Sequence, residues 1–406
     1  MDTPERSAAL PDAVRTRLAQ GTHSVLVDAR ALERVRERFD ADQARALGRY
    51  LANAQSANTL RAYRTDWTAF TAWCSEEGRT ALPADPVDVA VYLAACAQAR
   101  TPDGRPALAP ASIERRAAAL AAVHGAHGLS SPTRAEVVRL TLRGIRRTRR
   151  ARPRRKDPVV LSTLEMLLDH RPGPGHPGGI ARRRDTVLLL TGFAGALRRS
   201  ELAGITFDDI TVRIDPVGGA RTLLVALGAT KTDQEGRRDH VVALPRGRHR
   251  RTCPVCALAD WVELRTAHLR GGADAVRTLL VSEADAPPAT AHRCAGLDSA
   301  SLAPLADGSG RPLLVPVSRH GSLGTKAMTG QSVGDTVKKY AARAGLDPDA
   351  FGGHSLRAGF ATQAALGGAA DREIMRQGRW TNPRTVHDYI RSADPLDDNA
   401  VTRLGL

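Results

Sequence analysis

The chain has 406 residues, which predicts two or three domains at roughly 100–200 residues per domain. Lysine and arginine number 59 against 43 acidic residues, so the formal net charge is +16 and a polyanionic partner is indicated, either nucleic acid or an anionic membrane. Apolar residues make up 42%, which excludes disorder throughout, and the longest strongly apolar stretch, 186–197, is too short for a membrane span of about 20 residues.

The cysteines and the N-terminus indicate the compartment. Five scattered cysteines, an odd number, disfavour a disulfide framework and favour a reducing environment. The first twelve residues lack the apolar run of a secretory signal. We therefore expect a cytoplasmic protein without a membrane partner.

Residues 1–50 are predicted to form an N-terminal extension with one charged amphipathic helix, at about 31–47. Its apolar residues, Leu32, Val35 and Phe39, recur at helical spacing. No chemistry is assigned to this extension.

An all-helical domain is expected over 51–148. Its first helix carries an apolar stripe at intervals of three and four residues: Leu60, Tyr63, Trp67, Phe70 and Trp73. Such a stripe is typical of a buried helix face, so these rings are interpreted as core rather than as platforms for nucleic-acid bases. Ser56 or Asn58 could cap this helix and Gly78 could end it. Three further helices are expected after Pro86, near Ser112 and from about Arg134 to Ile145.

A strongly basic segment follows this domain. Residues 149–157 are predicted to be a linker, since such dense charge does not pack, and residues 143–156 hold nine basic residues in fourteen. We interpret them as a strap along a phosphate backbone, with a solvated hinge as the alternative. The predicted DNA contacts are Arg143, Arg146, Arg147, Arg149, Arg150, Arg152, Arg154, Arg155 and Lys156.

Residues 158–406 are predicted to form a second domain that mixes helices and strands. Ser162 is expected to cap one helix and Asp185 to open a buried one. Short β-like runs with turn residues between them follow at 210–214, 222–227 and 239–244. Helices resume near Cys256 and dominate to the end, apart from a polar insertion at about 284–311 that is expected on the surface.

Two arginines of this domain are placed to meet an anion. Arg198 leaves a buried apolar helix, where its charge costs free energy unless an anion is present, and Glu201 lies on the same helical face and can orient it. His354 and Arg357 are one helical turn apart, so their side chains can converge on one small target.

Two more elements extend this pattern. Trp380 precedes a short helix that Asn382 can cap and that carries Tyr389. Lys231 lies at the tip of a hairpin between two predicted strands. Each of these residues alone also fits a plainer role, as a core aromatic, a structural ion pair or a solvated turn charge.

Together these groups suit phosphoryl transfer without a metal ion. Guanidinium groups match the non-bridging oxygens of a phosphate and neutralise charge that grows in the transition state. A phenolic oxygen can be a nucleophile, and a lysine can protonate a leaving oxygen, which arginine cannot. Only five of the 59 basic residues are lysines, so a lysine at this hairpin supports an acid role. No carboxylate cluster suited to two Mg²⁺ ions is seen, and no cofactor is expected.

The order and spacing of these residues resemble the tyrosine recombinase (phage integrase) family. Its pattern is an Arg in a Leu-Arg-x-x-Glu-Leu context, a hairpin Lys, His-x-x-Arg, then His or Trp, and a Tyr nine residues later. The likeness covers residues 55–283 and 312–406. It implies a mainly α fold with a small antiparallel β-sheet, in which an all-helical, SAM-like DNA-clamp domain precedes a mixed α+β catalytic domain.

The resemblance also implies catalytic roles. Tyr389 would attack the scissile phosphate and become a 3′-phosphotyrosine, while Arg198 and Arg357 hold the non-bridging oxygens. Lys231 would protonate the departing 5′-hydroxyl, and His354 would act as acid and base on the tyrosine side.

Supporting roles and partners follow from the same resemblance. Trp380 would donate its indole N–H to the phosphate or pack the site, and Glu201 would support the arginines. The implied partner is double-stranded DNA with paired recombination sites, bound by a homotetramer at the nucleoid. The apolar tail after Tyr389 would dock on a neighbouring subunit.

Two other functions stay open. A type IB topoisomerase-like or telomere-resolving enzyme would use the same chemistry with a different outcome. A non-catalytic DNA-binding protein on the same scaffold would use none of it.

Cys253 and Cys256 form a lone Cys-x-x-C before an amphipathic helix. They could be half of a zinc site with His249 or His240, or a redox pair. Because no second Cys-x-x-C exists and Cys294 is distant in the sequence, a plain helix start is favoured and no metal site is predicted.

Overall fold

The computed structural model describes residues 56–149, 156–228, 240–284 and 290–390, and a few single positions near the two ends of the chain. Most of the helix predicted at 31–47 lies outside the described residues, as do Lys231 and most of the apolar tail. The predicted strap residues outside them are Arg150, Arg152, Arg154 and Arg155.

The chain divides into two compact units, Met1–Pro153 and Arg154–Leu406, and the division falls inside the predicted linker. No helix among the described residues has the length and apolar character needed to cross a membrane.

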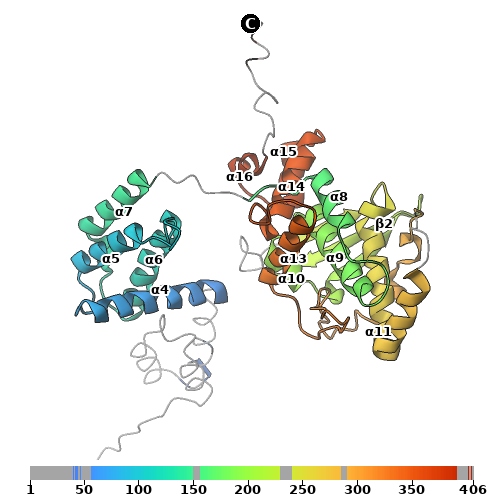
Figure 1. Ribbon diagram of the computed structural model, residues 1–406, viewed down its shortest axis with the longest axis horizontal. Helices are drawn as coiled ribbons and strands as arrows, with labels where there is room; N and C mark the ends of the chain where they lie inside the picture. The colour runs from blue at the N-terminus through green and yellow to red at the C-terminus, as the bar shows by residue number, and fades with distance from the viewer. Residues whose placement is uncertain are drawn as a thin grey trace, which may run out of the picture. The chain divides into compact units, whose positions relative to one another are not determined.

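The described part of the first unit, residues 56–149, is mainly helical. Its elements are α4 (Ala57–Glu76), α5 (Pro86–Gln98), α6 (Pro110–Ala126), the 3-10 turn η1 (Pro132–Arg134) and α7 (Glu136–Thr148) (Figure 1). Ser56, not Asn58, caps α4, since its hydroxyl accepts the amide of Thr59 at 3.2 Å. Gly78, just past its end, has a φ of +64°, a left-handed conformation that favours glycine.

The aromatic stripe of α4 packs into the core of this unit, as predicted. Phe70 is fully buried, and its ring centroid lies 5.7 Å from that of Trp67 and 5.0 Å from that of Tyr92 on α5. Trp73 also packs against Tyr92, with ring centroids 5.4 Å apart. These rings pack against one another, as the interpretation of the stripe as core predicts.

The last helix of this unit ends slightly later than predicted. Helix α7 continues to Thr148, three residues past the predicted end at Ile145, and the predicted linker, 149–157, follows it directly. The helix forms because Val138 and Ile145 pack on its buried face while its arginines lie on the exposed one. Arg149 closes its end by donating to the carbonyl oxygens of Ala97 and Leu108 at 3.2 and 2.9 Å.

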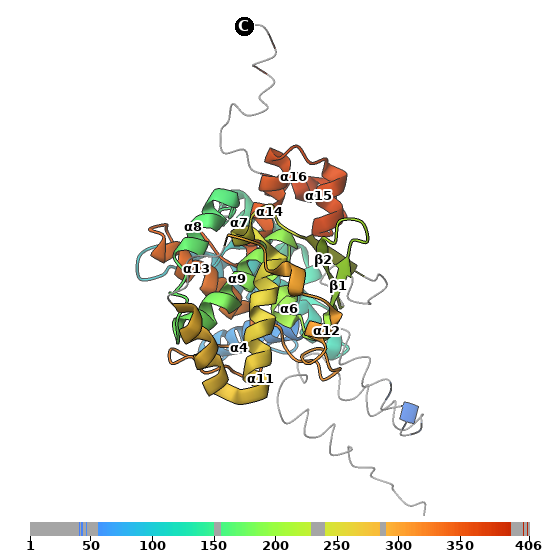
Figure 2. The same ribbon diagram turned by 90° about the vertical axis from the view of Figure 1, so that its right-hand side faces the viewer.

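The second unit packs helices against one face of a small sheet at its side (Figures 1 and 2). Before the sheet come α8 (Leu161–Asp169), α9 (Gly178–Ala194), α10 (Arg199–Gly204) and the 3-10 turn η2 (Phe207–Asp209). The strands are β1 (Ile210–Ile214), β2 (Arg221–Leu227) and β3 (His240–Pro245). After them come η3 (Arg250–Thr252), α11 (Pro254–Ala284), η4 (Cys294–Gly296), α12 (Ser299–Leu302), α13 (Gly330–Arg343), α14 (Gly353–Leu366), α15 (Asp371–Gly378) and α16 (Pro383–Tyr389).

The three strands form an antiparallel sheet in the order β1-β2-β3. Val212 pairs with Leu223, and Val225 pairs with Val242, so apolar residues of all three strands share the buried face. The strands lie within one residue of the predicted runs, and the predicted fold class, mainly α with a small antiparallel β-sheet, is confirmed.

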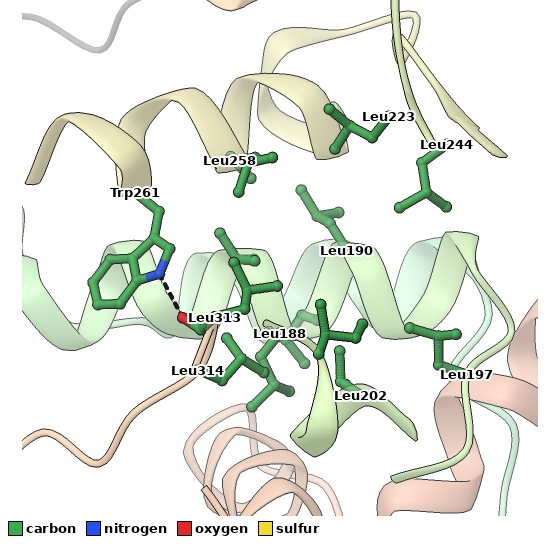
Figure 3. Close-up of a cluster of buried hydrophobic side chains, with 14 of the residues drawn as sticks. Leu188, Leu190, Leu197, Leu202, Leu223, Leu244, Leu258, Trp261, Leu313 and Leu314 are labelled. Atoms are coloured by element: carbon green, nitrogen blue, oxygen red, sulfur yellow. Dashed lines mark hydrogen bonds between the residues drawn. The ribbon is translucent and has the colours of Figure 1, made fainter. Parts of the chain in front are cut away.

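Helix α9 runs through the middle of the main core, where leucines from the surrounding elements converge on it (Figure 3). Leu188 and Leu190 are buried, together with Leu258 of α11 and Leu223 of β2. The indole Nε1 of Trp261 donates to the carbonyl oxygen of Leu313 at 2.8 Å, which fastens α11 to the segment before α13. From Val187 to Leu190 every residue of α9 is apolar and buried, which is typical of a core position.

Two predicted helix starts are wrong. Helix α9 begins at Gly178, and Asp185 is fully buried inside it, where its carboxylate accepts from Arg184 and Tyr340 and pairs with Lys339 at 3.2 Å. Helix α8 is not capped by Ser162, which lies inside it, and its first amide instead donates to the side chain of Gln363 at 2.9 Å.

The predicted surface insertion is also corrected. Its described part, residues 290–311, buries Cys294, Leu297, Leu302 and Leu305 in the main core. These residues are separated by three to five positions, and that spacing is enough to fold short turns onto the core although the segment is mostly polar.

Candidate active site

Arg198 lies where the chain turns from α9 into α10. Ala196, two residues before it, has a φ of +46°, and this turn carries Arg198 out of the buried helix. Its backbone N–H donates to Glu201 at 2.9 Å, and its guanidinium pairs with the other oxygen of the same carboxylate at 2.5 Å. The predicted pair of Arg198 and Glu201 is therefore present.

Arg357 is buried on α14, with 1% of its surface exposed. Its Nη1 donates to the carbonyl oxygen of Ala196 at 2.5 Å, and its guanidinium lies 4.1 Å from the ring centroid of Trp380. Its buried Nη2 has no hydrogen-bond partner among the described residues. A buried N–H of a charged group without an acceptor is costly, so an anionic ligand would stabilise this side chain.

A third buried arginine, Arg379, joins this cluster. It ends α15 in a left-handed conformation, with a φ of +57°, and its side chain is 5% exposed. Its guanidinium donates to Glu201 at 2.8 Å and to the carbonyl oxygens of Gly195 and Gln377 at 3.2 and 3.0 Å. Sequence reasoning missed this residue, since an arginine near a helix C-terminus is most simply a solvated cation.

The cluster therefore holds three guanidinium groups and one carboxylate. Burial and the positive charges of Arg198 and Arg379 lower the pKa of Arg357 to about 9. Burial alone would raise the pKa of Glu201, but hydrogen bonds from Arg198 and the charge of Arg379 outweigh it and hold that pKa below its usual value. The site thus has a partly buried excess of positive charge, which fits a phosphate diester.

Tyr389 ends α16 beside this cluster. Asn382 caps the helix as predicted, accepting the amide of Arg384 at 2.9 Å. The rings of Trp380 and Tyr389 have centroids 5.3 Å apart, and the hydroxyl of Thr362 donates to the carbonyl oxygen of Tyr389 at 3.0 Å. Since Trp380 also contacts Arg357, the structure brings the predicted arginines, tryptophan and tyrosine together.

The remaining predicted catalytic residues are His354 and Lys231. His354 lies exposed on α14, one turn before Arg357. Lys231 lies outside the described residues, in the connection between β2 and β3. The side-chain amide of Gln377 donates to the carbonyl oxygens of Ala194 on α9 and Ala243 on β3, at 3.0 Å each. One strand of that hairpin is therefore held against the helices that form the site.

Glu201→Gln is expected to lower the free energy of unfolding by about 3 kcal/mol near neutral pH. This is the low end for a buried ion pair that loses one partner, and the low end applies because glutamine keeps one acceptor oxygen. The lowered pKa of Glu201 means that its contribution is present above the unfolded pKa of about 4.3 and is lost as the pH falls through the folded value. Thermal unfolding from pH 7 to pH 3 should show the difference between the two chains shrinking with acidity. A difference that stays constant would contradict this role.

The comparisons with known proteins identify the family. The model described as "Phage integrase family" matches residues 313–395, and "Phage integrase, N-terminal SAM-like domain" matches residues 47–126. The chain belongs to the tyrosine recombinase, or phage integrase, family, and it is a site-specific DNA recombinase.

Similar proteins align with most of the chain. An integrase/recombinase XerD homolog of Selenomonas ruminantium is 32% identical over 362 residues, which cover 88% of each protein. The Cre recombinase of Escherichia phage P1 is 26% identical over 354 residues, which cover 86% of this chain and 88% of Cre. A crystal structure of the XerH site-specific recombinase has a TM-score of 0.44 at 15% identity, covering 90% of this chain and 82% of that one.

Proposed function

We propose that the chain cuts and rejoins double-stranded DNA through a covalent 3′-phosphotyrosine at Tyr389. The observation that carries the proposal is the buried Nη2 of Arg357, which has no acceptor among the described residues and lies in a site with more guanidinium groups than carboxylates. A phosphate oxygen would supply the acceptor and the negative charge that this site lacks.

The reaction balances with residues of this chain alone. The Oη of Tyr389 attacks the phosphorus and gives up its proton toward His354, and the bond from phosphorus to the 5′-oxygen breaks. Lys231 supplies the proton that this oxygen takes up. Arg198 and Arg357 neutralise the charge that grows on the non-bridging oxygens. A 5′-hydroxyl of a second DNA end then attacks the phosphotyrosine, so one diester bond is exchanged for another.

The proposed partner is a pair of DNA sites held by a homotetramer. Exchange between two duplexes breaks four strands, and each chain carries one Tyr389, so four copies supply the four nucleophiles. The net charge of +16 suits the DNA backbone, and Arg143 and Arg147 are exposed on α7 of the helical unit. We place this work in the cytoplasm, at the nucleoid.

The test uses the full chain and nicked duplexes tiled across the DNA that flanks its gene. When a nick lies near the cleavage point, the short strand that carries the new 5′-hydroxyl diffuses away. The phosphotyrosine then has no 5′-hydroxyl to rejoin, so the covalent intermediate is trapped. We expect a protein–DNA adduct that survives denaturation, without added magnesium, and a DNA-linked peptide that contains Tyr389. Binding without any adduct would favour a non-catalytic DNA-binding protein.

A supercoiled plasmid that lacks these sites separates recombination from the other outcomes. A recombinase that requires paired sites leaves such a plasmid supercoiled. Relaxation of the plasmid would indicate a type IB topoisomerase-like enzyme, and closed hairpin ends on a cut site would indicate a telomere-resolving one.

A further inference from the structure

A second cluster of reactive side chains lies in the catalytic unit and takes no part in the proposed reaction. Cys253, Cys256, His292 and Cys294 offer three thiol sulfurs and one imidazole nitrogen, and these ligand atoms all lie within 4.8 Å of one another. The three cysteines are buried, and all three are free thiols. Cys294 is distant in the sequence but adjacent in space, which removes the reason for predicting a plain helix start at Cys253.

The four residues come from two separate segments. Cys253 and Cys256 stand at the end of η3 and in the first turn of α11, whereas His292 and Cys294 precede and begin η4. Ion pairs hold the two segments together around the cluster. Arg293 pairs with Glu263 at 2.9 Å, and Arg250 of η3 pairs with Asp260 at 3.1 Å and donates to the carbonyl oxygen of Ala291 at 3.2 Å.

The histidine presents one ring nitrogen to the sulfurs. Its Nδ1 lies 3.3 Å from the Sγ of Cys256 and 3.8 Å from the Sγ of Cys294. Its Nε2 lies 3.4 Å from the carbonyl oxygen of Arg248, which can accept the Nε2 proton. In the tautomer that carries its proton on Nε2, the lone pair is on Nδ1, the nitrogen that faces the cysteines, as is usual for a histidine that ligates a metal.

Backbone amides also point at the sulfurs. The amides of Gly247 and Cys256 donate to the Sγ of Cys253 at 3.2 and 3.4 Å. Position 247 is restricted to glycine in this arrangement, because a Cβ there would lie 2.8 Å from the Cα of Cys253. Amide hydrogen bonds of this kind are typical of the surroundings of a thiolate that ligates a metal ion.

We propose that Cys253, Cys256, Cys294 and the Nδ1 of His292 bind one structural Zn²⁺ ion. In a tetrahedral site with zinc–sulfur bonds of about 2.3 Å, two sulfurs lie roughly 3.8 Å apart, which small side-chain adjustments within this cluster can reach. Three thiolates and one imidazole form a soft ligand set that suits zinc better than magnesium or calcium. Four protein ligands leave no position for water or substrate, so the role is structural.

The ion would fasten the insertion to the body of the catalytic unit. Leu297, just after η4, is buried in the main core, and its carbonyl oxygen accepts from Arg221 at the start of β2 at 3.3 Å. The cluster therefore braces the end of the sheet that is opposite the β2–β3 connection carrying Lys231. The pair Cys253 and Cys256 is far in the sequence from the pair His292 and Cys294, and the zinc ion would link the two pairs in the folded state.

Zinc analysis of the full chain tests the proposal. The chain, purified with zinc in all buffers and then freed of loose metal by gel filtration, should hold one zinc per molecule by mass spectrometry. Cys294→Ser and His292→Gln should reduce the bound zinc by at least about tenfold. Cys96→Ser is the matched control, since Cys96 is a buried thiol of the helical unit outside the cluster, and it should keep the full amount.

Cobalt supplies a measurement that needs no variant. The wild-type chain, exchanged into Co²⁺, should show the intense visible bands of a tetrahedral ion and the ultraviolet thiolate-to-metal band. A wild-type chain with no zinc and no such bands, or one with a disulfide between Cys253 and Cys256, would overturn the proposal. Neither readout uses DNA cutting, so a failure here leaves the proposed function untouched.

Discussion

Tyr389→Phe is expected to reduce covalent adduct formation on the nicked DNA by at least about 10⁴-fold, the scale on which loss of a nucleophile acts. The change removes only the phenolic oxygen. The ring keeps its contact with Trp380, whose centroid is 5.3 Å away, and the backbone carbonyl keeps its hydrogen bond from Thr362. The variant should therefore fold and bind DNA as the wild-type chain does, and gel-shift and adduct assays on the same DNA check both points.

Tyr63→Phe is the matched control for this experiment. Tyr63 is partly buried on α4 of the helical unit. Tyr63→Phe therefore removes the same phenolic oxygen from a residue that is not part of the proposed site. Its adduct yield should equal that of the wild-type chain. An adduct that persists undiminished in Tyr389→Phe would assign the nucleophile to another residue.

Tyr389 and the helices near it pack around a small apolar cluster of their own. Trp380 and Val386 belong to a small apolar cluster with Ala361 and Ile374, apart from the main core around α9. Helices α14, α15 and α16 contact one another within it (Figure 2). A small core can open at lower free energy than a large one, so α16 with Tyr389 can adjust around DNA while Arg357 and Arg379 stay bonded to the turn after α9.

Local patterns in the sequence predict most of the fold. The three strands were predicted within a residue because each alternates buried and exposed residues between turn residues, and that signal is contained in the strand itself. The candidate site residues Arg198, Arg357 and Tyr389 are predicted because each lies in a short motif, and the order of the motifs is specific. The strand alternation and the short motifs are each contained within one segment of the chain.

What the sequence did not predict depends on residues far apart. Arg379 pairs with Glu201, 178 positions away, and the buried carboxylate of Asp185 accepts from Tyr340, 155 positions away. Cys294 looks isolated until the insertion folds back on α11. In each case only the tertiary structure supplies the partner, and that partner offsets the free-energy cost of burying a charged or polar group.

Arg357→Ala is expected to slow the cutting of DNA by about 10³-fold, the upper range for losing one group that stabilises an oxyanion. Arg357→Lys should restore little of this rate. A lysine cannot reach the carbonyl oxygen of Ala196, lie over Trp380 and present a second N–H to a phosphate at the same time, as the planar guanidinium does. Single-turnover adduct formation on the nicked DNA measures both variants.

A neutral phosphate separates the charge of Arg357 from its packing. If the arginine acts by neutralising a non-bridging oxygen, DNA with a methylphosphonate at the scissile position needs that charge less, since one negative oxygen is gone. The defect of Arg357→Ala should then shrink by at least about tenfold on this DNA, an easing of some 1.4 kcal/mol in the barrier difference. An unchanged defect on both substrates would mean that Arg357 serves only to hold Trp380 and the turn at Ala196 in place.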